Sequence, residues 1–173
     1  MRRRSIHRSA SDPTGDAVTP EPDISIRIFS EPQLLSGIRA LVDAVGVGMG
    51  FFEKSRCLMS LAIDEALSNV IRHGYEGRKD GMIWIHIWRI PDPRGLRFVI
   101  EDLARAVDPA KIKGRHLDDV RPGGLGVHII TETMSDVAWE VRKDGGMRLT
   151  MSKRLSDEER QAVEQATQGN TNS

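Results

Sequence analysis

A carboxylate and a carboxamide stand one helical turn apart in the stretch LAIDEALSNVIRHGYEG, residues 61–77. On a helix, Asn69 lies about 40° around the axis from Glu65, so the two side chains share one stripe. The apolar residues of this stretch centre roughly 130° away from Glu65. A polar pair beside apolar neighbours suggests the wall of a cleft. A chance Glu-x-x-x-Asn pair on a half-exposed face explains the spacing almost as well.

A second carboxylate ends an apolar run. The stretch LRFVIED, residues 96–102, has the pattern of a strand that ends on Asp102. A carboxylate at the end of a strand, beside a loop, can accept a hydrogen bond from an exocyclic amine in a pocket. Taken alone, Asp102 is explained equally well as a solvated residue at a strand end.

Three glycines come directly before an apolar helical pattern, at Gly123, Gly124 and Gly126. Small residues let a ligand approach the backbone closely, and the free amides at a helix start attract phosphate oxygens. The segment matches neither the dinucleotide-binding fingerprint nor the Walker motif. A flexible turn that enters a helix is therefore the alternative to a phosphate site.

The segment between Asp102 and these glycines is rich in basic residues. A mobile basic loop can close over a polyphosphate, although charges of this kind often only keep a loop soluble. The basic residues in question are Lys111, Lys113, Arg115 and Arg121.

Hydrophobic periodicity places these residues on a short series of elements. Ser30 and Gln33 form a capping box for the first helix, which Gly46 and Gly48 are expected to end. A long second helix contains Glu65 and Asn69. The predicted strands lie at 24–29, 81–90, 96–103, 136–142 and 147–154, and the predicted helices at about 30–46, 53–75 and 124–134.

This order predicts an α+β fold. We expect a two-layer α/β sandwich, with a mostly antiparallel mixed sheet and helices on one face. The ordered domain is expected at 23–155, after a disordered tail at 1–22. Residues 156–173 form a polar tail that starts with a short helix capped by Ser156 and Glu159. Cys57 is expected to be a small buried residue in a helix.

Composition excludes several classes of protein. Lysine plus arginine number 25 and aspartate plus glutamate number 25, which argues against a direct nucleic-acid binder. The basic start MRRRSIHRSA lacks a following apolar region, so we expect no secretory signal. No apolar stretch approaches the length of a membrane span. A single cysteine fits a reducing compartment, and we expect a cytoplasmic protein without a membrane partner.

Taken in order, the elements resemble the ATP-binding domain shared by histidine kinases, gyrase, Hsp90 and MutL. More narrowly, about residues 24–154 resemble the bacterial anti-sigma-factor serine kinases. The stretch IDEALSNVIRHGYEG is similar to the N box of that family, including its His-Gly-Tyr ending. EDLARAVDP stands where the first glycine box belongs, GGLGVHII resembles the second, and MRLTMSKR resembles the final strand.

The resemblance implies ATP and magnesium as ligands. Asn69 would ligate the Mg²⁺ that bridges the ATP phosphates, since a carboxamide offers a hard oxygen without charge. Glu65 would be the general base that takes the proton of the substrate serine hydroxyl. Asp102 would accept a hydrogen bond from the adenine amine, supported by Thr150 directly or through water. Amides for the phosphates would come from Gly124, Leu125, Gly126 and Val127.

One segment departs from the pattern of the family. The first glycine box usually has Asp-x-Gly, often with a second glycine two residues on, whereas this chain has Ala104 and Ala106. Alanine is small enough for adenine to fit beside Ala104, but a positive φ at either position would be strained.

The function implied by the resemblance combines an enzyme and a regulator. The chain would sequester a sigma factor, and would use ATP to phosphorylate a serine of an anti-anti-sigma protein. It would act as a homodimer. The alternative is a partner-switching scaffold with weak or no catalysis, which the two alanines favour and the retained Glu65 and Asn69 oppose.

Overall fold

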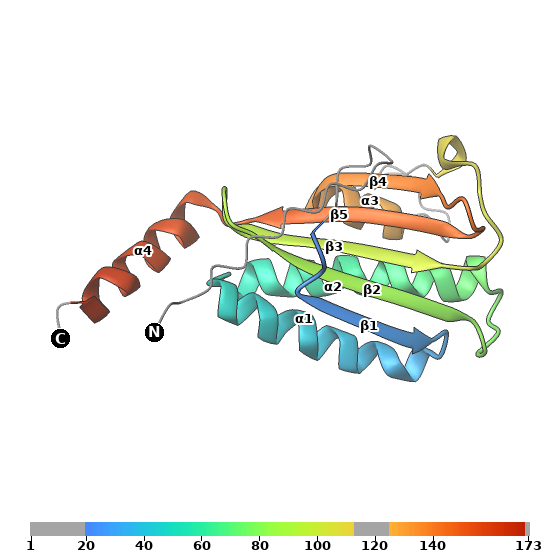
Figure 1. Ribbon diagram of the computed structural model, residues 1–173, viewed down its shortest axis with the longest axis horizontal. Helices are drawn as coiled ribbons and strands as arrows, with labels where there is room; N and C mark the ends of the chain where they lie inside the picture. Colours follow the sequence, from blue (N-terminus) through green and yellow to red (C-terminus); the bar gives the residue numbers. More distant parts are fainter. Residues whose placement is uncertain (1–19, 113–124, 172–173) are drawn as a thin grey trace, which may run out of the picture.

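The computed structural model describes residues 20–112 and 125–171. Its five strands form a single sheet in the order β1-β2-β3-β5-β4, and every neighbouring pair is antiparallel (Figure 1). All five predicted strands are present, with bounds that differ by one or two residues at most. The strands are β1 (Ile24–Phe29), β2 (Met82–Ile90), β3 (Gly95–Asp102), β4 (Ser135–Val141) and β5 (Met147–Arg154).

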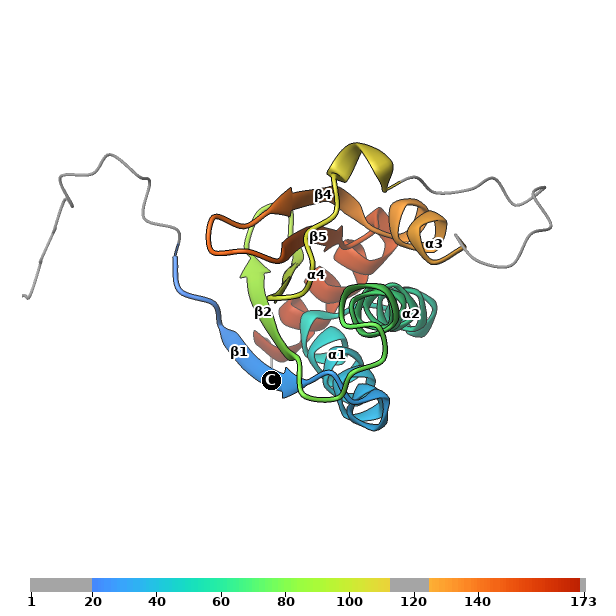
Figure 2. The same ribbon diagram turned by 90° about the vertical axis from the view of Figure 1, so that its right-hand side faces the viewer.

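Three helices cover one face of this sheet, as Figure 2 shows. They are α1 (Leu35–Met49), α2 (Glu53–Asn69) and α3 (Leu125–Thr133). Two short 3₁₀ turns, η1 (Pro32–Leu34) and η3 (Pro109–Lys111), and one π-helical turn, η2 (Val70–Gly74), complete this part of the chain. The predicted α+β fold with two layers is therefore confirmed.

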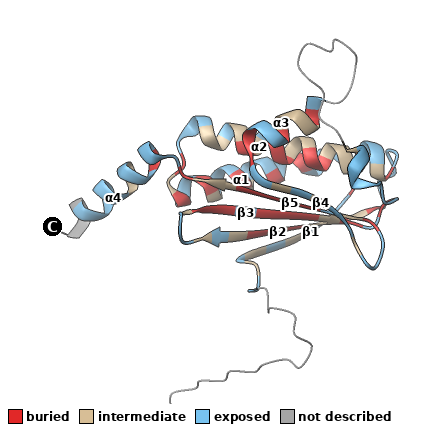
Figure 3. Ribbon diagram, turned by 90° about the horizontal axis from the view of Figure 1, so that it is seen from above, coloured by how far each residue is buried: buried red, intermediate tan, exposed pale blue. Residues whose placement is uncertain are grey.

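The core lies between the sheet and the three helices. Alternation along β2 turns Ile83, Ile85 and Ile87 toward the helices, where each is at most 1% exposed. Met59 and Ile63 of α2 are fully buried against them. Figure 3 shows the buried residues concentrated on the strands and on the sheet-facing sides of the helices. The other face of β2, which carries Trp84, His86 and Trp88, is the outer face of the sheet.

Helix α1 begins and ends differently from its prediction. The Ser30 hydroxyl donates to the Arg78 carbonyl at 2.5 Å and accepts from the Gly81 amide at 3.0 Å, so the capping box with Gln33 is wrong. The helix also runs through Gly46 and ends at Gly50, whose φ of 91° suits glycine. Apolar packing of the last turn, with Met49 buried, outweighs the low helix propensity of glycine.

The C-terminal segment forms a longer helix than predicted, α4 (Asp157–Thr171). The predicted capping box is present: Ser156 N donates to Glu159 Oε2 at 2.8 Å, and Glu159 N donates to Ser156 Oγ at 3.2 Å. Beyond this start the helix projects away from the end of the sheet (Figure 1).

Two remaining expectations concern Cys57 and the membrane. Cys57 is exposed on α2, so its prediction as a buried residue is wrong: its position on the helix turns it away from the sheet. Within the described ranges, no helix has the length and apolar character needed to cross a membrane.

Candidate functional site

A cavity of about 250 Å³ opens between the end of α2 and the sheet. Its walls come from the last turns of α2 and from η2, from the end of β3, from β4 and β5, and from the first turn of α3. The lining is mostly apolar, with a few polar groups, which is typical of a site for a small organic ligand. The polar and glycine residues of the lining are Asn69, His73, Gly74, Asp102, Arg105 and Gly126.

Glu65 and Asn69 both lie against Gly126, and of these three residues Asn69 and Gly126 line the cavity. A Cβ placed on Gly126 would lie 2.6 Å from Glu65 Oε2 and 3.3 Å from Asn69 Nδ2. The first turn of α3 therefore packs directly on both polar side chains, and only glycine leaves them in place. Of the pair expected on a cleft wall, Asn69 lines the cavity, whereas Glu65 lies beside it against Gly126.

The polar atoms of this pair remain available to a ligand. Asn69 is half-buried and lines the cavity, and its carboxamide has no hydrogen-bond partner within residues 20–112 and 125–171. The Glu65 side chain is 26% exposed, and its Oε2 lies 3.7 Å from Nη2 of Arg72. The Asn69 carboxamide thus borders the cavity, and the Glu65 carboxylate lies next to it with the Arg72 guanidinium beside it.

Asp102 forms the polar floor of the cavity and is only 3% exposed. Its Oδ1 accepts from Ala104 N at 2.8 Å and from Met147 N at 3.3 Å. Burial raises the pKa of Asp102, although these two amides oppose the shift. Oδ2 accepts no hydrogen bond from the part of the chain that the structure describes, so it is available to a donor inside the cavity.

The turn after α2 is what brings the cavity residues together. The helix widens into the π-helical turn η2, which carries the cavity residues Val70, His73 and Gly74. Tyr75 follows and anchors this turn to the sheet: its hydroxyl donates to Met82 O at 2.6 Å and accepts from Leu103 N at 3.0 Å. The His-Gly-Tyr ending therefore links the helix to the ends of β2 and β3.

The two alanines of the first glycine box do not strain the backbone. Among the described residues other than glycine, only Glu76 and Asp136 have a positive φ. Ala104 and Ala106 therefore adopt ordinary conformations, and Ala104 N still donates to the Asp102 carboxylate. The sequence departure does not distort this side of the cavity.

The remaining predicted site residues have different outcomes. Val127 lines the cavity, whereas Leu125 is 51% exposed at the start of α3. Gly124 lies outside the described residues, as do Gly123, Lys113, Arg115 and Arg121. Lys111 ends the turn η3.

Thr150 does not lie on the side of the sheet where it was predicted to support Asp102. It pairs with Val99 across β3 and β5, and both lie with Glu101 on the outer face of the sheet. Because side chains alternate along a strand, Thr150 and Asp102 face opposite sides of the sheet. The predicted support of Asp102 by Thr150 is therefore wrong. The amide of Met147, three residues earlier, occupies that role.

Several cavity residues were missed because their sequence signals are weak. Trp139, Met147 and Leu149 reach the cavity from the hairpin of β4 and β5, and Arg105 from the segment after β3. Period-two alternation does place Trp139 and Leu149 on the inner face of their strands. Nothing in the local sequence says which inner-face residues border a cavity, because that depends on the spacing between α3 and the sheet.

The chain matches known proteins over most of its length. The model of the histidine kinase-like ATPase domain family matches residues 28–153. The serine-protein kinase RsbW of Listeria innocua is 27% identical over 144 residues, which cover 79% of this chain and 89% of that protein. RsbW of Oceanobacillus iheyensis is 27% identical over 143 residues, with the same two coverages. RsbW of Bacillus pumilus is 26% identical over 146 residues, covering 78% of this chain and 87% of that protein.

A solved structure is also similar. The crystal structure of the RsbU and RsbW domains of a Mycobacterium tuberculosis protein has a TM-score of 0.53 and 18% identity. The match covers 79% of this chain and 33% of that longer chain, so this protein spans about a third of it. This likeness supports the fold. The family match includes α2, β3 and α3, which build the cavity, and the chain belongs to the histidine kinase-like ATPase domain family.

Proposed function

We propose that this protein is an ATP-dependent protein serine/threonine kinase that acts as an anti-sigma factor. It sequesters a sigma factor and phosphorylates a serine of an anti-anti-sigma protein. One observation carries the proposal: Glu65 and Asn69 converge on Gly126, and Asn69 and Gly126 line the same cavity as the buried Asp102. The relatives named serine-protein kinase RsbW support the same activity.

In this proposal the cavity holds the nucleoside and its mouth holds the phosphates. Asp102 Oδ2 accepts the exocyclic amine of adenine, and the apolar walls contact the faces of the base. Ala104 lies beside that pocket, against Gly74 of its lining. The amides of Leu125, Gly126 and Val127 at the start of α3 reach the phosphates, because a helix N-terminus favours negative charge. The proposal from the sequence adds Gly124, which lies outside the described residues.

The described residues offer one ligand for a magnesium ion. One protein ligand is enough when the ATP phosphates and water supply the others. No group of three or more His, Cys, Asp or Glu in the described ranges could hold a metal by itself. Mg²⁺ commonly keeps several waters and is shared with substrate phosphates, so one protein oxygen can suffice. The unpartnered carboxamide of Asn69 fits this arrangement. When bound, the ion neutralises charge on the phosphates.

Glu65 is placed to handle the proton of the attacking hydroxyl. Its carboxylate lies beside Gly126 of the cavity lining, one turn before Asn69, and is 26% exposed, so a serine side chain from a partner protein can reach it. As the proton leaves that hydroxyl for Glu65, its oxygen attacks the terminal phosphorus and ADP departs. The protein accelerates phosphoryl transfer mainly by positioning these groups, and it forms no covalent bond with the substrate.

Partner exchange follows from the product of this reaction. A phosphoserine carries about −1.5 to −2 charges at pH 7, enough to disrupt a close interface between two proteins. The proposed cycle therefore releases the anti-anti-sigma protein and leaves the kinase free to hold the sigma factor. We propose that the kinase works as a homodimer in the cytoplasm, where transcription takes place.

The alternative is a partner-switching scaffold without effective catalysis. Ala104 and Ala106 in the first glycine box favour it. Their ordinary backbone conformations and the availability of Asn69 and Asp102 to a ligand oppose it.

Transfer of labelled phosphate from Mg-ATP to a candidate anti-anti-sigma protein separates the two functions. We expect Glu65→Gln to lower the transfer rate by about a hundredfold or more while leaving ATP affinity within a few-fold. Asp64→Asn is the matched control: it removes the same charge from the neighbouring position, where the carboxylate binds Arg39 rather than the cavity.

The outcomes are distinct. Transfer that survives in Asp64→Asn and vanishes in Glu65→Gln supports the kinase. ATP binding without transfer in the wild type supports the scaffold. Absence of any binding at millimolar Mg-ATP contradicts the proposed ligand itself.

A further inference from the structure

Arg142, in the turn between β4 and β5, holds the main chain directly behind the cavity. Its Nη1 donates to the carbonyl oxygen of Asp102 at 2.7 Å. Its Nη2 lies 3.9 Å from Glu101 Oε2, and its guanidinium lies over the ring of Trp84, 5.8 Å from the ring centre. The side chain is only 17% exposed. A single guanidinium therefore contacts three neighbouring residues of two strands.

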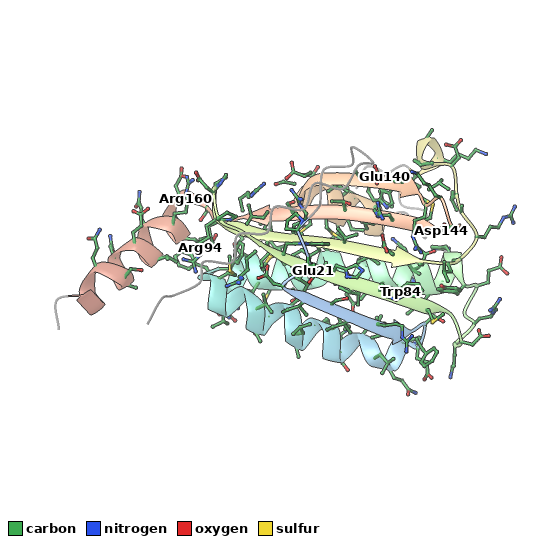
Figure 4. All side chains as sticks on the ribbon, in the orientation of Figure 1. Glu21, Trp84, Arg94, Glu140, Asp144 and Arg160 are labelled. Atoms are coloured by element: carbon green, nitrogen blue, oxygen red, sulfur yellow. The ribbon has the colours of Figure 1, made fainter. Side chains whose placement is uncertain are left out.

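These contacts belong to a polar network on the outer face of the sheet. Glu101 Oε1 accepts from Arg148 Nε at 2.6 Å, and Glu101 Oε2 lies 4.0 Å from His86 Nε2. Trp84 and Glu140, both labelled in Figure 4, stand on β2 and β4 at the same face. The network fixes Glu101, which is 14% exposed.

Glu101 and Asp102 are consecutive on β3, so their side chains point to opposite faces of the sheet. Arg142 contacts both residues, the first through its carboxylate and the second through its carbonyl. The Asp102 carbonyl is also close to the hairpin backbone, since a Cβ on Gly146 would lie 2.0 Å from it. Displacement of this carbonyl would shift the main chain of Asp102 and, with it, the carboxylate in the cavity.

We propose that Arg142 is a positioning residue that sets the direction of the Asp102 carboxylate and thereby the preference of the cavity for an adenine amine. It acts from behind the sheet and touches no ligand. The inference rests on the proposed function, because it requires that Asp102 contacts the base. Through Arg142, the polar network on the outer face of the sheet would influence which base the cavity prefers.

The test compares ATP with inosine triphosphate, in which a carbonyl oxygen replaces the exocyclic amine. The ratio of their dissociation constants reports the contact with Asp102 and cancels effects on ribose and phosphates. Isothermal calorimetry with magnesium gives both constants for the full chain. The variants are Arg142→Gln, Arg142→Lys and the matched control Arg148→Gln, which removes the same charge from Glu101 without touching Asp102.

We expect the wild type to prefer ATP, and Arg142→Gln to reduce the preference by about five- to tenfold, the effect of one hydrogen bond. Arg148→Gln should leave the ratio unchanged. Arg142→Lys keeps the charge and can donate to the Asp102 carbonyl, so it should restore part of the preference. Melting temperatures for each variant show how much folded protein enters the titration. If Arg142→Gln does not fold, a ratio in Arg142→Lys that lies between those of the wild type and Asp102→Asn supports the inference.

Three results would overturn either the proposed function or the role of Arg142. A wild type that binds both nucleotides equally contradicts the adenine contact and with it the proposed function. A wild type that prefers ATP, together with an unchanged ratio in the folded Arg142 variants, overturns only the role of Arg142. Equal losses in the Arg142 and Arg148 variants also overturn it, because they would show a general effect of charge.

Discussion

Gly74 makes room for Ala104. A Cβ placed on Gly74 would stand 2.8 Å from the Cβ of Ala104, closer than two such carbons approach in proteins. Gly74 ends the π-helical turn after α2, and Ala104 follows the end of β3 and is 9% exposed. The alanine that replaces a glycine in the first box is therefore accommodated by a glycine on the facing turn.

We expect Gly74→Ala to lower the free energy of unfolding by about 1–3 kcal/mol, because the added methyl overpacks this contact. Nucleotide affinity should fall with it, since Gly74 lines the cavity. Urea denaturation measures the change. Gly37→Ala is the control: the site on α1 has no atom within 4 Å of an added Cβ, and alanine there favours the helix.

The double variant Gly74→Ala with Ala104→Gly restores the original number of methyl groups at the contact. We expect it to recover most of the stability lost in Gly74→Ala, with a coupling energy of about 1 kcal/mol or more. Additive effects of the two substitutions would show that the contact with Ala104 is not the cause.

Gly126→Ala should separate folding from catalysis. Alanine is a better helix former than glycine, yet its Cβ would lie 2.6 Å from Glu65 Oε2. Glu65 must then move by roughly 1 Å, which can cost about a hundredfold in the rate of phosphate transfer. We expect circular dichroism and melting to stay near those of the wild type. Gly48→Ala, where an added Cβ meets nothing within 4 Å, should leave transfer unchanged.

Asp102 predicts a pH dependence of nucleotide binding. Burial raises its pKa above the ordinary value of 3.8. Ionised Asp102 offers the adenine amine a charged acceptor at Oδ2, and protonation removes that charge and weakens the hydrogen bond, so affinity is full above the raised pKa and falls as pH decreases through it. Calorimetry of ATP binding at a series of mildly acidic pH values measures this. Inosine triphosphate should not show the same fall.

The same shift makes Asp102 costly for the fold. Because its folded pKa is raised, the folded state binds the proton more tightly than the unfolded state, and stability decreases as pH rises from 3.8 through the folded pKa. We expect Asp102→Asn to melt higher than the wild type at neutral pH and to lose the preference for ATP over inosine triphosphate. The difference in melting temperature should shrink in acid. A lower melting point at neutral pH would contradict the assigned direction.

Glu159 joins α4 to the start of α2. It is 1% exposed, and its oxygens accept from Phe52 N at 2.7 Å and Ser156 N at 2.8 Å. Burial opposes its ionisation, but these amides outweigh burial and hold its pKa below the ordinary 4.5. Its stabilisation is therefore present at neutral pH and is lost as pH falls through the lowered pKa.

We expect Glu159→Ala to lower the free energy of unfolding by about 1–3 kcal/mol and to release α4, because two buried amides lose their acceptor. Faster hydrogen exchange across α4 and at Phe52 reports the release. Glu158→Ala, next to it and exposed, should change neither measurement. Equal exchange in the two variants would mean that α4 is held by other contacts.

Much of the fold could be predicted because its signals are local. The alternation of Ile83, Ile85 and Ile87 with Trp84 and His86 predicted the strand β2, and the one-turn spacing placed Glu65 and Asn69 on one stripe. Capping was predicted correctly where the partners are neighbours, as at Ser156 and Glu159. It failed at Ser30, whose hydroxyl binds Arg78 and Gly81, some fifty positions away in the chain.

In the candidate site too, the local features could be predicted and the long-range contacts could not. The sequence placed the Asp102 carboxylate at the end of a strand. The register of β3 with β5 decided that the Met147 amide donates to this carboxylate and that Thr150 lies on the other face. A one-residue difference in position moves a side chain to the opposite face of a sheet, and pairing of distant strands is not written in a local pattern.

By itself, the sequence determined the elements, the stripe of Glu65 and Asn69, and the family resemblance, since each depends on spacing along the chain. Only the tertiary structure decided that Gly126 closes on that stripe, that Gly74 accommodates Ala104, and that Arg142 holds Asp102 from the other face. Those relationships depend on distances between segments that are far apart in the chain, which packing of helices on the sheet sets to within a fraction of an ångström.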